Sequence, residues 1–354
     1  MKPKERVCTA FAHREPDRVP VDYHANVEID GLLKQYFGLA ADDDELLRQK
    51  LDVDFRPGVA PYAGPQLHVA GPGIRCNIWG AHTTWIDHGN GGYWDFCDWP
   101  LRDADIDEVE AWPMPDPDDF DYDAAIRQCR EYADYFVMGG GVGTGDTINQ
   151  SGFLRHMEQV MIDLVTDDPA GLRLIDRRQD IEIEVLKRTL EACNGGIDMV
   201  AIGEDLGSQR GPLLSLDLFR RHLRPRLQRY IDVAASFDLP VMMHSDGSVD
   251  WVYDDLIAMG VNVVDAVQIE CANMDPASLK RRFGDRLSFH GVWPTTGALE
   301  RGTVDEAVAE ARDVLSIMMP GGGFAMSPAH LIQSTSPVEN VVAVYEMIRE
   351  HGKY

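Results

Sequence analysis

Leu239-Pro240-Val241-Met242-Met243-His244-Ser245-Asp246-Gly247-Ser248 begins as an apolar run and ends abruptly in polar residues. A short apolar run between turn residues is typical of a buried strand in a parallel sheet. In parallel α/β proteins the chemistry takes place at the carboxyl ends of the strands. His244 and Asp246 therefore predict a site that holds a metal ion or shares a proton. The alternative is a turn in which Asp246 caps the next helix.

Seven further short apolar runs occur along the chain, and most are separated by helical patterns such as those at 150–164 and 169–193. This alternation predicts an α/β fold of the (β/α)8 TIM-barrel type. A doubly wound open sheet is the alternative, but no nucleotide-binding glycine motif follows a strand. With the run at 239–243, the expected strands lie at 18–23, 53–57, 135–139, 199–203, 261–267, 286–290 and 323–327.

The region from 58 to 100 interrupts this alternation, because it is rich in Gly, Pro, His and Trp and has no helical period. It predicts an insertion of loops and a hairpin, and an acidic, proline-rich connector follows up to residue 117. Its aromatic side chains either line a pocket or form a small hydrophobic core of their own. We expect a single barrel domain over 1–354 that carries this insertion and connector at 58–117.

The chain has a formal net charge of -26, which argues against nucleic-acid and anionic membrane partners because both need basic patches. Its six cysteines are scattered and form no C-x-x-C pair, as in proteins of a reducing compartment. No apolar run approaches the length of a membrane span, and no signal-peptide pattern opens the sequence. We therefore expect a soluble, cytoplasmic protein.

Polar residues follow most of the expected strands, and in a barrel they converge on one mouth. Two histidines and a carboxylate suit zinc or another divalent ion, with one position left open for a substrate. The candidate ligands are His244 and Asp246, with His330 as one candidate for the second imidazole. For His330 the alternative is a packed loop histidine. Other side chains near the strand ends are predicted to contact the substrate, namely Tyr23, His24, Gln209, Gln268 and Trp293.

Three acidic residues near the same ends are candidates for proton transfer: Glu204, Asp205 and Glu270. For Glu204 and Asp205 the alternative is turn and cap chemistry. Glu270 comes soon after the mostly apolar run 263–267, so it must face the mouth or be paired.

A family likeness is carried by seven stretches, at 14–20, 204–210, 244–248, 267–268, 275–280, 283–285 and 335–340. Through them the chain resembles the uroporphyrinogen decarboxylase superfamily over almost its whole length, and this resemblance also implies a (β/α)8 barrel. The porphyrinogen decarboxylases carry an arginine-rich segment after the first strand, where this chain has Asp22-Tyr23-His24-Ala25-Asn26. Without those cations a porphyrinogen bearing many carboxylates would be held poorly.

The other large branch of the superfamily contains the cobalamin-dependent methyltransferases, which bind zinc through an H-x-C-G motif and a later cysteine. The resemblance places Asp246 at the first cysteine and His330 at the second, with Glu270 near a glutamate that can approach the zinc. A set of oxygen and imidazole ligands leaves a stronger Lewis acid than two thiolates do. Such an ion suits the polarisation of an ether or alcohol oxygen better than the activation of a thiol.

The resemblance therefore implies a zinc-dependent methyltransferase that moves a methyl group between a small O- or N-methylated substrate and a corrinoid protein. No D-x-H-x-x-G motif is present, so the cobalamin is expected on that partner. One alternative is a metal-independent decarboxylase or other lyase, anchored by Arg56 or Arg210. A second alternative is a non-catalytic protein that binds a small molecule or a cobamide. The family likeness suggests a monomer or a homodimer.

Overall fold

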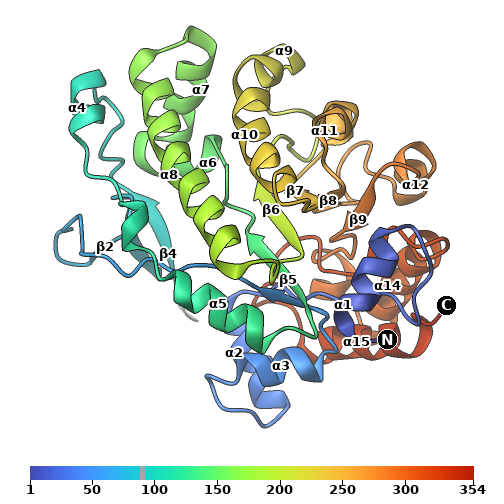
Figure 1. Cartoon of the computed structure of the whole chain (residues 1–354). Helices are drawn as coiled ribbons and strands as arrows, with labels where there is room; N and C mark the ends of the chain where they lie inside the picture. The colour runs from blue at the N-terminus through green and yellow to red at the C-terminus, as the bar shows by residue number, and fades with distance from the viewer. Residues whose placement is uncertain (88–91) are drawn as a thin grey trace.

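Seven parallel strands curl into a sheet with helices on its outside (Figure 1). The structure is a computed structural model that describes residues 1–87 and 92–354. Neighbouring strands are parallel throughout, in the order β1-β5-β6-β7-β8-β9-β10, which confirms the predicted TIM-type barrel. The strands are β1 (Phe55–Pro57), β5 (Phe136–Gly140), β6 (Met199–Gly203), β7 (Val241–His244), β8 (Val263–Asp265), β9 (Ser288–His290) and β10 (Phe324–Ala325).

The segment that precedes β1 closes the barrel. Val21 forms a parallel bridge with Met326, just after β10, and its carbonyl accepts the N–H of Asp54 at 2.8 Å. The segment thus hydrogen-bonds to both edges of the seven-stranded sheet. The strand predicted at 18–23 forms only two isolated bridges, Val21 with Met326 and Arg18 with Lys353, since Pro20 has no N–H to donate to a regular ladder.

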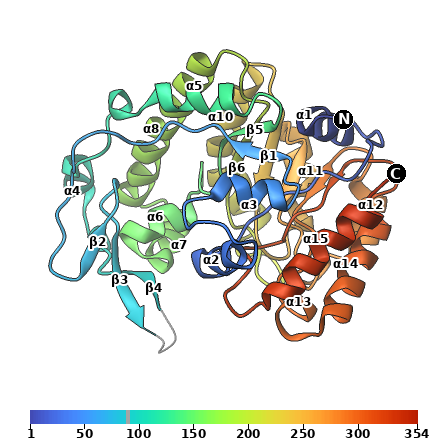
Figure 2. The ribbon, with the colours of Figure 1, turned by 90° about the horizontal axis from the view of Figure 1, so that it is seen from below.

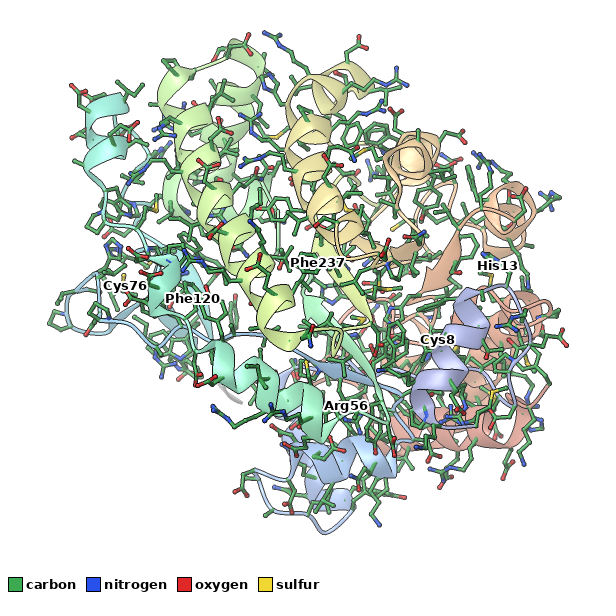
Figure 3. All side chains as sticks on the ribbon, in the orientation of Figure 1. Cys8, His13, Arg56, Cys76, Phe120 and Phe237 are labelled. Atoms are coloured by element: carbon green, nitrogen blue, oxygen red, sulfur yellow. The ribbon has the colours of Figure 1, made fainter. Side chains whose placement is uncertain are left out.

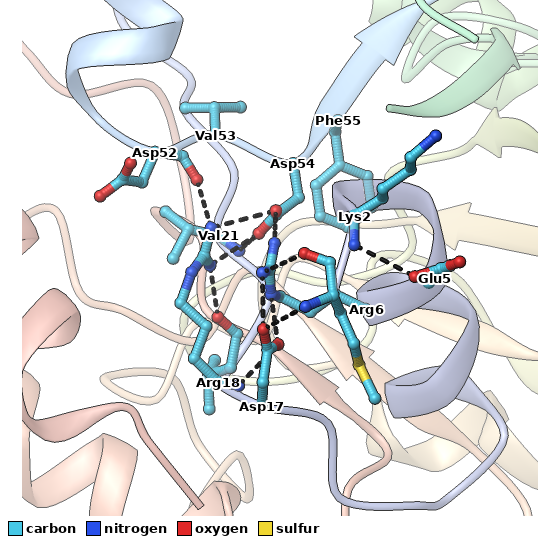
Figure 4. Close-up of polar contacts among 12 residues, drawn as sticks. Lys2, Glu5, Arg6, Asp17, Arg18, Val21, Asp52, Val53, Asp54 and Phe55 are labelled. Atoms are coloured by element: carbon cyan, nitrogen blue, oxygen red, sulfur yellow. Dashed lines mark hydrogen bonds and ion pairs between the residues drawn. The ribbon is translucent and has the colours of Figure 1, made fainter. Parts of the chain in front are cut away.

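A buried cluster of charges fixes this closing segment to β1 (Figure 4). The carboxylate of Asp54 is fully buried and accepts hydrogen bonds from Arg6 Nη1 at 2.7 Å and Arg18 Nη1 at 2.8 Å. It also accepts the backbone N–H of Val21 at 2.9 Å. Asp17 pairs with the Nε of Arg6 at 2.7 Å. Residues 14–20, one of the stretches that carry the family resemblance, therefore help to close the barrel.

Helix α1 (Pro3–Phe11) closes the amino end of the barrel, and Figure 2 shows it beside β5. Val7 belongs to the cluster of buried side chains inside the barrel, together with Phe55, Phe136 and Met199. Phe55, Phe136 and Met199 are the first residues of their strands, so the opposite, carboxyl end of the barrel remains for a site.

The remaining helices cover the outside of the barrel and its loops. Asp168 starts the longest of them by accepting the N–H groups of Ala170 and Gly171 at 3.0 Å, with Pro169 in the first turn. The helices are α2 (Val27–Tyr36), α3 (Asp44–Lys50), α5 (Tyr122–Glu131), α6 (Ile148–Arg155), α7 (Met157–Thr166), α8 (Pro169–Cys193), α9 (Leu216–Leu218), α10 (Arg224–Ala235), α11 (Tyr253–Met259), α12 (Pro276–Phe283), α13 (Ala298–Arg301), α14 (Val304–Met318) and α15 (Val338–His351), with short 3-10 or π turns at Pro117–Asp119, Phe219–Leu223 and Asp250–Val252.

The single helix expected over 150–164 is two helices, α6 and α7. His156 separates them with φ of 68°, a left-handed conformation that a continuous helix cannot contain. None of the helices in the described part of the chain is long and apolar enough to cross a membrane.

The insertion forms a separate three-stranded antiparallel sheet of β2 (Ile74–Cys76), β3 (His82–Asp87) and β4 (Gly92–Cys97), followed by α4 (Ile106–Ala111). It packs on the barrel helices through a small hydrophobic cluster, in which Phe96 stacks on Phe153 with ring centroids 3.5 Å apart. A cavity of about 310 Å3, lined by Trp79 and Phe120, lies between the insertion and α8. The aromatic residues thus form both a sub-core and a pocket wall.

All six cysteines are free. Figure 3 shows Cys8 on α1 and Cys76 on the insertion at opposite sides of the molecule. This agrees with the absence of a cysteine framework in the sequence.

Candidate metal centre at the barrel mouth

His244 is the last residue of β7 and lies opposite Asp265, the last residue of β8. Its Nδ1 atom is 2.6 Å from Oδ2 of Asp265. With the proton assigned to Nδ1, the imidazole donates to the carboxylate and its Nε2 keeps a lone pair for another ligand. The register of β7 and β8 therefore holds the Nδ1 side of the His244 ring against Asp265 and leaves its Nε2 atom available to a metal ion.

Asp246 stands in the turn that follows β7. Gln268 donates its Nε2–H to Oδ1 of Asp246 at 3.0 Å, and its Oε1 accepts the N–H of Gly247 at 2.7 Å. Gly247 has φ of 85°, which favours glycine and lets the chain turn back here. Gln268, predicted to touch the substrate, thus fixes both the turn and the carboxylate.

Asp205, which follows β6, completes a cluster of three donors. Its Oδ1 accepts the N–H of Asp246 at 3.0 Å, and its Oδ2 accepts an amide N–H of Asn149 at 2.8 Å. One donor atom from each of Asp205, His244 and Asp246 lies within 4.8 Å of the others. His330 is beside them, with its Nε2 3.8 Å from Oδ2 of Asp246 and its side chain 46% exposed. The structure thus gathers His244, Asp246 and His330, and it adds Asp205 to them.

The charges around His244 favour a cation. Burial by itself lowers the pKa of His244, but the hydrogen bond and charge of Asp265, followed by the charges of Asp246 and Asp205, raise it to about 9. Burial and the charge of Asp205 outweigh the two nearby imidazoles and raise the pKa of Asp246. Carboxylates held this close repel each other, and a bound cation would relieve that repulsion.

Asp265 holds a second histidine through its other oxygen. His290, at the end of β9, has its Nδ1 2.6 Å from Oδ1 of Asp265. The Nε2 of His290 is 3.2 Å from Oδ2 of Asp22, and the Nε2 of His24 is 3.2 Å from the same oxygen. Burial lowers the pKa of His290, but the two aspartates, Asp265 first, raise it to about 10. Imidazoles and carboxylates therefore alternate from β7 through β8 and β9 to the closing segment before β1.

Asp265 and Asp22 were missed as site residues in the sequence. Asp265 lies inside the apolar run 261–267, where an unpaired carboxylate would be costly, and that cost was a usable signal. Asp22 sits in a strand-like stretch, and nothing local distinguishes it from a turn residue.

Glu204 lies elsewhere and has other partners. Its two oxygens accept the N–H groups of Thr147 at 2.7 Å and Ile148 at 3.1 Å, at the start of α6, and only 1% of the residue is exposed. Burial and the charge of Asp146 raise its pKa. Glu204 thus caps the start of α6, which was the alternative to the predicted role in proton transfer.

The other predicted residues are spread around the mouth. Glu270 is exposed and accepts a hydrogen bond from Thr296 at 3.2 Å. The hydroxyl of Tyr23 donates to Asp30 at 3.1 Å, and Gln209 is exposed. Trp293 is buried against Tyr345, with ring centroids 5.5 Å apart. Of the predicted substrate contacts, only His24 and Gln268 join the clusters of histidines and carboxylates.

Comparison with solved structures finds a methyltransferase from Methanosarcina mazei with a TM-score of 0.64, 20% identity and 99% coverage of both chains. At this identity the likeness shows a shared fold. A 3-keto-D-glucoside 4-epimerase from E. coli has a TM-score of 0.39 and 13% identity over 65% of this chain and 83% of its own, too distant for further argument. A search of curated protein sequences gives no match.

The sequence profile described as uroporphyrinogen decarboxylase (URO-D) matches residues 100–351. This range covers most of the barrel, from β5 to α15, and includes Asp205, His244, Asp246 and His330. The chain therefore belongs to the uroporphyrinogen decarboxylase family.

Proposed function

We propose that this protein is a metal-dependent methyltransferase that moves a methyl group between a small O- or N-methylated compound and a corrinoid carried by a partner protein. One observation carries the proposal: the donors of Asp205, His244 and Asp246 converge, with His330 beside them, at the barrel mouth. The fold shared with the Methanosarcina mazei methyltransferase supports it.

The residues present fit a zinc ion. His244 offers Nε2, because its Nδ1 is engaged by Asp265. Asp246 offers Oδ2, because Gln268 engages Oδ1. His330 is exposed enough to turn inward as the third ligand, and Asp205 is the alternative third ligand. A bound zinc ion would supply a Lewis acid that polarises the oxygen or nitrogen from which the methyl group departs.

The protein's own groups would position the substrate and manage the proton. Breaking a methyl–oxygen or methyl–nitrogen bond leaves an atom that gains a proton. Asp205 is the acidic candidate that lies within the cluster, whereas Glu204 is sealed by α6. His24 reaches the mouth from the first segment of the barrel, where it can contact a substrate oxygen or nitrogen.

Decarboxylation of a polyanionic substrate fits this mouth less well. Arg56, one of the two predicted anchors, is buried and forms a bidentate pair with Glu45, at 2.6 and 2.8 Å. Its guanidinium also stacks on Tyr135 at 3.9 Å from the ring centroid. The mouth instead presents Asp22, Asp205 and Asp246, which repel substrate carboxylates.

The decisive experiment measures metal content and methyl transfer together. Protein purified without chelator is analysed for zinc as wild type, His244→Ala and His330→Ala, with His82→Ala as the control. His82 is a partly exposed histidine of the insertion that faces one carboxylate, Asp98. The proposal expects His244→Ala to lose one equivalent of zinc, His330→Ala to bind it more weakly and His82→Ala to match the wild type.

Transfer is then assayed with a panel of O-methyl and N-methyl compounds and reduced cobalamin, followed by the change in corrin absorbance. The reverse direction starts from methylcobalamin. Wild-type zinc content that survives in His244→Ala would overturn the ligand assignment. Absence of transfer in both directions across the panel, with zinc bound, would overturn the proposed reaction.

A further inference from the structure

We propose that Asp22, His24 and His290 form a second divalent metal site, separate from the His244 group. The three residues come from two segments that the barrel brings together: the closing segment before β1 and the end of β9. One donor atom of each lies within 4.8 Å of the other two. This inference does not depend on the proposed methyl transfer.

The distances match a metal site. Oδ2 of Asp22 lies 3.2 Å from Nε2 of His24 and 3.2 Å from Nε2 of His290. Ligands placed about 2.0 Å from a tetrahedral ion are about 3.3 Å apart, which matches both distances from Asp22. One ring nitrogen of His24 also lies within 4.8 Å of one of His290. Two imidazoles and one carboxylate select zinc or a similar first-row ion over calcium or magnesium.

His290 provides the second observation. It is fully buried, and its Nε2 has no hydrogen-bond partner of good geometry among the described residues. Its Nδ1 is held by Asp265 at 2.6 Å. A metal-binding histidine commonly has this arrangement, with an outer carboxylate on one nitrogen and the other nitrogen aimed at the ion. A buried nitrogen without a good partner is costly unless something binds it.

The site is buried on one side and open on the other. Asp22 is 5% exposed, whereas the side chain of His24 is 41% exposed. A fourth position would therefore face the barrel mouth, where water or a substrate oxygen can enter. Asp22 also accepts the N–H of Tyr23 through Oδ1, which leaves Oδ2 for the ion.

Asp265 connects this site with the His244 group but belongs to neither set of donors. Its Oδ2 orients His244 and its Oδ1 orients His290, so each imidazole aims its Nε2 at a different cluster. The two sites can therefore be emptied one at a time by substituting a ligand that only one of them uses.

Cobalt(II) titration of chelator-treated protein tests this inference, because the visible absorption of bound cobalt reports the number of sites and their geometry. The variants are His24→Ala, Asp22→Asn and His244→Ala, with His82→Ala as the control. Asn at position 22 can keep the bond from the Tyr23 N–H while losing the charge. Circular dichroism and thermal unfolding establish that each variant is folded.

The expected result is two cobalt ions in the wild type and in His82→Ala, and one in His24→Ala and in His244→Ala. Asp22→Asn should bind the second ion at least tenfold more weakly. A wild type that binds one ion, lost in His244→Ala and kept in His24→Ala, would overturn the second site and leave the first. If the wild type binds two ions and only His24→Ala loses one, the second site is supported. His244 is then not a ligand of the first site.

Discussion

The Nδ1 atom of His244 lies 2.6 Å from Oδ2 of Asp265, across the last paired residues of β7 and β8. The other oxygen of the same carboxylate holds His290 at 2.6 Å. One buried aspartate thus sets the orientation of two imidazoles that face different clusters of donors.

Asp265→Asn should weaken metal binding at both sites by about 10- to 100-fold, because an amide cannot accept the Nδ1 protons of two histidines. The measurement is the dissociation constant for cobalt(II) or zinc. Asp255→Asn is the matched control, since Asp255 is as buried as Asp265 but pairs with Arg220 and Arg224 on α10 and its preceding turn. Equal metal affinity in the two variants would contradict the role given to Asp265.

Gln268→Leu should lower zinc affinity by about tenfold, because Asp246 would lose the bond that orients its carboxylate. The turn at Gly247 would also lose an acceptor. Gln268→Glu should be worse, since a second negative charge would face Asp246. Gln209→Leu, an exposed position in a nearby loop, is the control and should leave zinc affinity unchanged. If Gln268→Leu binds zinc like the wild type, the orienting role is wrong.

Arg18→Ala should reduce the free energy of unfolding by about 3 kcal/mol, because the buried carboxylate of Asp54 would lose one of its two guanidinium partners. Urea denaturation measures this loss. Arg14→Ala lies four residues earlier and is exposed, so it should change stability by less than about 0.5 kcal/mol. Similar losses in both variants would show that the cluster around Asp54 is not what holds the closing segment.

Asp146 should make the stability of the folded chain depend on pH. Burial raises its pKa to about 6, against the bond from the N–H of Asn149. The folded protein therefore holds this proton more tightly than the unfolded chain, and the resulting stability is present near pH 4 and lost as the pH rises through 6. The expected loss is about 3 kcal/mol.

Asp146→Asn removes this titration while keeping an acceptor for Asn149. The free energy of unfolding of the wild type, minus that of Asp146→Asn, should fall between pH 4 and pH 7. Asp123→Asn, an exposed position, should follow the wild-type profile. Parallel profiles for wild type and Asp146→Asn would exclude a raised pKa at this residue.

The barrel could be predicted from the sequence because its strands are apolar runs of fixed rhythm, such as 199–203 and 239–243. The gathering of His244, Asp246 and His330 at one mouth could be predicted because each comes shortly after such a run. Asp265 could not be placed by its local pattern, since its partners come from β7 and β9 and the pairing depends on register. Asp205 and Glu204 are neighbours in sequence, but the start of α6 engages Glu204 and leaves Asp205 at the mouth, which only the packed structure reveals.

The pairing of Val21 with Met326 has a consequence for how the chain is made. The first segment of the barrel has to wait for almost the last one, because its neighbour on the sheet emerges from the ribosome more than 300 residues later. The backbone of Val19 likewise bonds to Gly352, close to the other terminus. During synthesis the open edge beside β1 stays unpaired, so an incomplete chain exposes a strand edge that favours aggregation or capture by a chaperone.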